Sequence, residues 1–167
     1  MEFVELYNPT AAAIPLANLA LILVNGAAAP AGEYSRVLLG PAGAIAAGGY
    51  LVIATPAVTV QGSGVLYTPP VAEWPATNAV QNGPSDGMLL VDTAALTVID
   101  RLSYAGSVTV NLAGFGTVNL VEGTATSAVD SSSIVRSIAR LPNGTDTNDA
   151  AADWHVATPT PGAANLP

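Results

Sequence analysis

The chain has 167 residues, of which 50% are hydrophobic and 10% charged, with a formal net charge of −8. Only four residues are Lys or Arg, so the chain lacks the basic footprint of a nucleic-acid-binding surface, and anionic membrane surfaces would repel it. The absence of cysteine excludes a disulfide framework and thiolate zinc sites. The 16 glycines and 13 prolines lie between apolar runs, as in many short strands joined by turns. We therefore expect one all-β domain over residues 1–167.

Several apolar runs have the length of β-strands. The run 19–24 is apolar throughout and ends at an Asn-Gly turn, which predicts a strand buried on both faces. In the first run Val4 and Leu6 share one face, the better candidate for the core. A turn at 92–95 predicts a hairpin, and 106–123 leaves room for one or two further strands. The expected strands are 2–7, 19–24, 36–39, 50–54, 87–91, 98–104, 134–141 and 152–156.

Residues 61–84 read as an irregular, proline-rich insertion of a length that is usually functional or mobile. Tyr67 and Trp74 are its ligand-binding candidates, because two aromatic rings exposed on one rim would stack against a sugar. The alternative is that both side chains cover an open end of the fold.

The loop that precedes the last expected strand is rich in oxygen-bearing side chains. Such side chains are typical of turns, where they accept hydrogen bonds from the nearby backbone. Their oxygens are also possible ligands of Ca²⁺, although the spacing is not that of an EF-hand. Arg136 and Arg140 lie nearby, and either pin this loop by ion pairs or line a ligand site. The calcium candidates are Asp146, Asn148, Asp149 and Asp153.

No arrangement in the sequence predicts catalysis, and no cofactor is expected. His155 is the sole histidine, and Asp153, two residues earlier in the expected strand, would stand beside it rather than in a relay. Glu2, Glu5 and Asp100 are carboxylates in strands, where solubility explains them better than glycosidase chemistry.

The apolar run 11–24 does not predict a signal or a membrane span. Pro15 and Asn18 interrupt it, acidic residues precede it, and it is shorter than the roughly 20 residues that a span requires. If the protein is exported, we expect its signal upstream of Met1, with this chain cut from a longer protein.

Seven segments in order resemble a bacterial lamin-tail domain, over nearly the whole chain. That family has an immunoglobulin-like β-sandwich of two mainly antiparallel sheets, so the resemblance implies this fold. The segments are 2–9, 48–53, 81–87, 103–106, 144–147, 153–154 and 159–162.

The chain departs from the family pattern in two places. Family members usually begin with one more strand ahead of the segment that resembles 2–8, and the usual Gly-Trp pair is replaced by Asn18-Leu19-Ala20. A missing edge strand would leave a sheet edge open to pairing with another chain. We therefore expect homodimerisation through this edge.

The resemblance implies a non-catalytic binding or structural module of a secreted or cell-surface bacterial protein. Such a module would mediate protein–protein contact, or position a neighbouring domain of nuclease or phosphatase type. The eukaryotic relatives lie in the tails of nuclear intermediate-filament proteins, but the coiled-coil rod is absent here, so filament formation does not carry over. A carbohydrate-binding module and a Ca²⁺-dependent adhesion module remain as alternatives.

Overall fold

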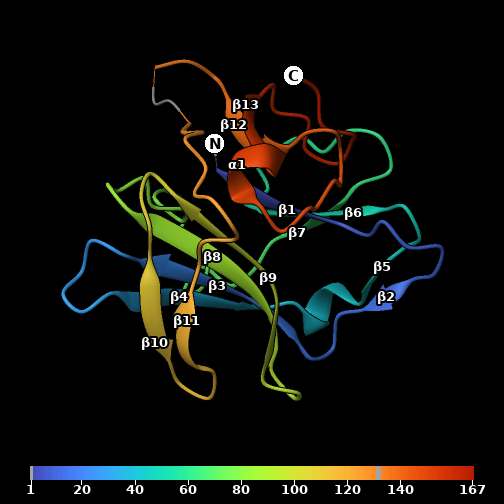
Figure 1. Ribbon diagram of the computed structural model, residues 1–167. Coiled ribbons are helices and arrows are strands. Elements are labelled where there is room, and N and C mark those ends of the chain that lie inside the picture. Colours follow the sequence, from blue (N-terminus) through green and yellow to red (C-terminus); the bar gives the residue numbers. More distant parts are fainter. Residues whose placement is uncertain (1, 131–132) are drawn as a thin grey trace.

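The computed structural model describes residues 2–130 and 133–167 and is all-β (Figure 1). Its largest sheet has the order β4-β3-β8-β9, with every neighbouring pair antiparallel. The central strand β3 is the apolar run seen in the sequence, and its residues 20–24 are all buried. The prediction of a strand buried on both faces is confirmed. The bounds are β3 (Leu19–Asn25), β4 (Gly32–Leu38), β8 (Asp86–Asp92) and β9 (Thr97–Tyr104).

A second sheet packs on one face of this sheet. It has the order β1-β6-β7, with β1 antiparallel and β7 parallel to β6. Val4 is buried between the two sheets and Leu6 packs against the same cluster, as predicted for this face of the first strand. The bounds are β1 (Phe3–Tyr7), β6 (Tyr50–Ala54) and β7 (Val65–Tyr67).

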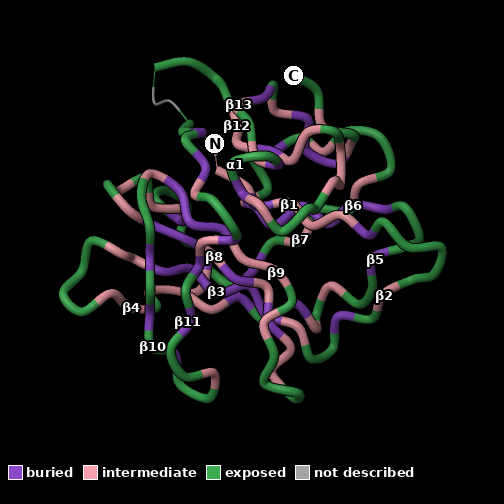
Figure 2. Tube along the Cα trace, viewed as in Figure 1, coloured by how far each residue is buried: buried purple, intermediate pink, exposed green. Residues whose placement is uncertain are grey.

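The opposite face of the large sheet is covered by a hairpin. β10 (Thr109–Leu112) pairs with β11 (Gly116–Asn119), which are the further strands expected within 106–123. Their apolar side chains form a second cluster with the other face of β3 and β8. Alternating side chains of β3 therefore enter two separate cores, and Figure 2 shows buried segments concentrated at the centre of the molecule. The fold is sandwich-like, as expected.

The remaining elements are short. β2 (Ile14–Pro15) pairs with β5 (Ala44–Ile45), and a 3-10 turn spans Gly40–Ala42. β12 (Ser137–Arg140) pairs with β13 (Trp154–Ala157), and α1 (Ala150–Asp153) precedes β13. No helix of the described residues is long and apolar enough to cross a membrane.

Three strands differ from the sequence prediction by two residues or more at one end. The strand expected at 152–156 begins only at Trp154, because Asp149 caps a helical turn over Ala150–Asp153 by accepting a hydrogen bond from the Ala151 N–H. β12 is shorter than 134–141, and β4 is longer than 36–39. The extra length of β4 comes from pairing with β3, which its polar residues do not signal.

Candidate functional site

A cleft with a volume of about 580 Å³ lies between β1, β9 and β12. Its floor is apolar and belongs to the inter-sheet core. Leu6, Leu19, Met88 and Leu90 pack against that core, yet each is only partly buried because the cleft opens onto them. Partly solvated side chains at the margin of a core are the kind of surface that a protein ligand covers.

One wall of the cleft is the unpaired edge of β1. The Asn8 N–H donates to the Gly49 carbonyl over 3.0 Å, and the β1–β6 register continues this pairing. Because antiparallel strands alternate, Val4 and Leu6 direct their backbone groups to β6, whereas residues 3, 5 and 7 direct theirs to the open edge. Within residues 2–130 and 133–167, these outward N–H and C=O groups have no hydrogen-bond partner.

The opposite wall is the free edge of β12. The Leu141 N–H donates to the Asp153 carbonyl over 2.9 Å, so the same alternation directs the backbone of Ile138 and Arg140 away from β13. The Arg140 carbonyl accepts from Asn165 Nδ2 at 3.1 Å, whereas no partner for the Ile138 backbone lies among the described residues. Two incompletely paired strand edges thus border one cleft.

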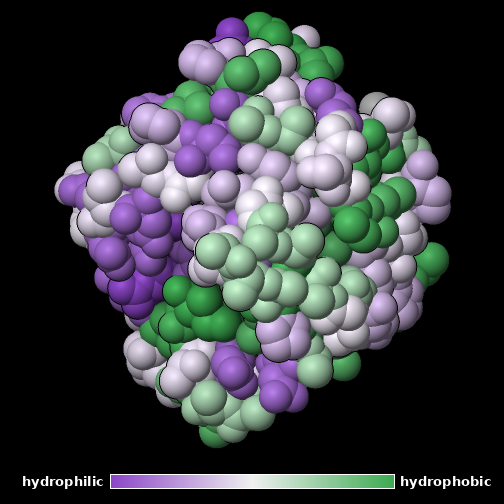
Figure 3. Space-filling view, turned by 90° about the vertical axis from the view of Figure 1, so that its right-hand side faces the viewer, coloured by the Kyte–Doolittle hydropathy of each residue, from purple (hydrophilic) through white to green (hydrophobic). Residues whose placement is uncertain are grey.

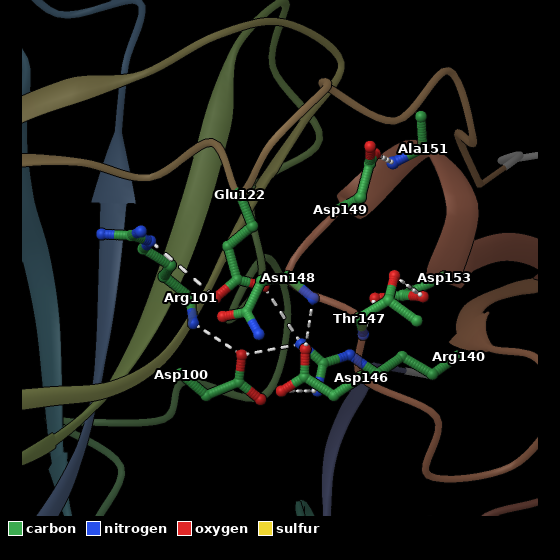
Figure 4. A network of polar contacts seen from close by, with 10 residues as sticks. All are labelled: Asp100, Arg101, Glu122, Arg140, Asp146, Thr147, Asn148, Asp149, Ala151 and Asp153. Carbon is green, nitrogen blue, oxygen red and sulfur yellow. Dashed lines mark hydrogen bonds and ion pairs between the residues drawn. The ribbon is translucent and has the colours of Figure 1, made fainter.

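An ion-pair network centred on Arg140 lies at the cleft (Figure 4). The Arg140 guanidinium lies 2.9 Å from Asp100 Oδ1, 3.2 Å from Glu122 Oε2 and 3.2 Å from Asp146 Oδ2. It also stacks over the Trp154 ring at 5.1 Å from the centroid, a cation–π contact. The expectation that an arginine pins the acidic loop is confirmed for Arg140.

Burial has the largest effect on the pKa values of two acids in this network. It raises the pKa of Asp100 and of Glu122, and the Arg140 charge partly opposes both shifts. Arg101 adds a longer contact, with its Nε 3.8 Å from Glu122 Oε1. Burial and the arginine charges therefore act on the pKa values of these carboxyl groups in opposite directions, and burial has the larger effect.

The three acidic calcium candidates have separate structural roles, and the fourth candidate, Asn148, takes part through its backbone N–H. Asp146 contacts Arg140 and accepts a hydrogen bond from the Asn148 N–H. Asp149 caps α1 and accepts a hydrogen bond from Thr124. Asp153 is buried and accepts hydrogen bonds from the Thr147 N–H at 2.7 Å and from the Thr147 hydroxyl at 2.8 Å. The hydrogen bonds from Thr147 lower the pKa of Asp153 against the effect of burial. Among the described residues, no group of three or more His, Cys, Asp or Glu side chains could hold a metal ion.

The other charged candidates are dispersed. His155 is exposed, with its Nε2 3.0 Å from the Ala152 carbonyl, and Asp153 is bonded to Thr147 instead. Glu2 accepts from the Ala79 N–H at 2.7 Å, and Glu5 accepts from the Gly162 N–H. Burial raises the pKa of Glu5 to about 7, although the Gly162 N–H acts against it.

The insertion 61–84 contains β7 and contributes to the core. Trp74 is only 2% exposed and belongs to the inter-sheet cluster. Tyr67 lies in β7, packs against that cluster and donates its hydroxyl to the Leu38 carbonyl over 3.0 Å. The condition for sugar stacking, two rings exposed on one rim, is not met, and both residues serve as cover for the sandwich.

Sequence reasoning missed the cleft itself. The sequence predicts Leu6 and the run 19–24 as core, and it predicts only a strand for the residues 87–91. Asp100 and Arg140, which form an ion pair, are 40 residues apart in the chain. The one sequence signal for the cleft was the expectation of an open edge at the first strand.

On the face of the molecule shown in Figure 3, hydrophilic residues gather at the left of the view and hydrophobic residues occur as separate patches.

No family model matches the chain, and neither does any of the curated proteins or solved structures with which we compared it.

Proposed function

We propose that the chain is a non-catalytic binding module that contacts another polypeptide through the cleft between β1, β9 and β12. One observation carries this proposal: side chains of the inter-sheet core stay partly open to solvent along an unpaired strand edge. Covering such a surface removes apolar area from water, which favours binding by roughly 25 cal/mol for each Å² that is buried. Backbone groups at the edge offer directional hydrogen bonds to the same ligand.

The polar groups around the cleft support a binding role. Arg140 forms ion pairs with Asp100, Glu122 and Asp146, and Glu5 accepts a hydrogen bond from the Gly162 N–H. General acid–base catalysis needs a group that can reach a substrate proton in the correct protonation state. These side chains are instead engaged in holding the strands and the loop 141–149 around the cleft.

The resemblance to bacterial lamin-tail domains is the basis for the wider part of the proposal. On that basis the domain is an immunoglobulin-like sandwich within a secreted or cell-surface bacterial protein. There it would mediate protein–protein contact or position a neighbouring domain.

Selection from a displayed library of random peptides tests the binding role. We expect clones to be enriched on the wild-type chain, and to bind at least about tenfold more weakly to a Leu90→Gln variant, because this change makes the cleft floor polar. Leu96→Gln is the matched control, since Leu96 is 53% exposed and lies outside the cleft. Circular dichroism verifies that both variants fold. Failure to enrich any clone, or equal retention on all three proteins, would refute the proposal.

A further inference from the structure

We propose that the ligand of the cleft is an extended segment of a partner polypeptide, inserted as a strand between β1 and β12. This inference rests on the proposed binding function and names the ligand of the same site. The two walls are strands whose free edges offer N–H and C=O groups at alternate residues, at 3, 5 and 7 in β1 and at 138 in β12. An inserted strand is the ligand that pairs with both edges at once.

The length of β1 sets the length of the ligand segment. The five residues of β1 extend over about 17 Å, and neighbouring strands in a sheet are separated by about 4.8 Å. Insertion would join β1-β6-β7 and β12-β13 into one continuous sheet. It would also satisfy the backbone groups that are now unpaired, because a polar group that became buried without a partner would lose its hydrogen bonds to water.

The floor determines the pattern of side chains on the ligand. In a strand beside β1, every second side chain points to the same side as Val4 and Leu6, towards the inter-sheet core. Those positions must be apolar, because they cover Leu19, Met88 and Leu90. The alternate positions point to the side of Glu5, away from this core.

Charge decides against a second copy of the chain as the ligand. Five carboxylates line the cleft, and two of its three arginines, Arg101 and Arg140, already contact acids. Two copies would each carry a net charge of −8, and antiparallel pairing of all five residues of β1 would place Glu5 directly opposite Glu5 of the other copy. We therefore assign the cleft to a segment of a different protein, with lysine or arginine at its outward positions.

Amide hydrogen exchange measured by NMR tests this assignment residue by residue. The probe is a synthetic peptide of about nine residues, with valine at alternate positions and lysine or threonine between them, added at about 1 mM. We expect exchange at Phe3, Glu5 and Tyr7 to slow at least tenfold when the peptide binds. Val4 and Leu6, whose N–H groups already point to β6, should change little. This alternation is specific to strand pairing.

A pair of substitutions in β12 tests the second edge. Ile138→Pro removes the outward N–H without removing a bond to β13, and Ile138→Ala is the control that shortens the side chain but keeps the donor. We expect the proline variant to bind the peptide about tenfold more weakly than the alanine variant, which corresponds to one lost hydrogen bond. Equal affinities would overturn pairing with β12.

Two other outcomes would also overturn the inference. Unchanged exchange at Phe3, Glu5 and Tyr7 would exclude strand insertion, whereas protection that rises with protein concentration alone would identify a second copy as the ligand. If the displayed library still yields clones that depend on Leu90 while these amides remain unprotected, the binding function stands and only the inserted strand is refuted.

Discussion

Replacing Arg140 by alanine tests whether the network at the cleft stabilises the fold. The Arg140 side chain is 12% exposed, and its removal leaves Glu122, at 7% exposed, and Asp100 without their closest cation. Breaking a buried ion pair by removing one partner costs about 3–5 kcal/mol. Arg101 stays 3.8 Å from Glu122, so we expect a loss near 3 kcal/mol in the free energy of unfolding. For a chain of this length that lowers Tm by about 6–12 °C.

Urea unfolding at several pH values is the assay. Without Arg140, the pKa values of Asp100 and Glu122 rise further, so the variant loses stability as pH increases through them. The deficit relative to wild type should therefore be smallest near pH 4 and largest near pH 8. Arg136→Ala is the control, because Arg136 is exposed and lines the same cleft without an ion pair among the described residues; it should change stability by less than about 0.5 kcal/mol. An Arg140 variant within about 1 kcal/mol of wild type at pH 8 would refute this reasoning.

Three further predictions concern the core, the tail and pH. Trp74→Ala should lower the free energy of unfolding, measured in urea, by about 3–5 kcal/mol, because Trp74 is buried in the core. Val71→Ala, in the same insertion but at a residue that is 77% exposed, should have little effect. Equal effects of the two substitutions would contradict a core role for the insertion. Gly162→Ala should lower the free energy of unfolding by at least about 1 kcal/mol more than Gly43→Ala does. Both glycines have positive φ, but of the two only Gly162 would bring a Cβ into collision with the backbone of residue 61. Similar thermal midpoints for the two variants would argue against this close approach. Glu5 has its pKa raised to about 7, so the folded state binds the extra proton and stability should fall by about 1–2 kcal/mol, after allowance for solvent screening, as pH rises from about 4.5 to about 7. A Glu5→Gln variant should lack this slope, and identical pH profiles would disprove the assignment.

The sequence by itself determined the class of the fold and most of its strands. A run such as 19–24, apolar at every position, has few alternatives to a strand buried on both faces, and the turn at 92–95 predicts the β8–β9 hairpin from local chemistry. Local patterns also predicted that Asp149 and its neighbours cap turns through their side chains. In the structure, Asp149 accepts a hydrogen bond from the Ala151 N–H, and Asp146 accepts one from the Asn148 N–H.

Only the tertiary structure decided which candidates meet. Trp74 looked like a ring available to a sugar, yet it is buried because the insertion folds back over the inter-sheet core. Arg140 and Asp100 form an ion pair across 40 residues of sequence, and the cleft exists because the edges of β1 and β12 remain unpaired beside the same floor. Side-chain periodicity reports burial along one segment, whereas the pairing of strand edges and the meeting of charges depend on how distant segments pack.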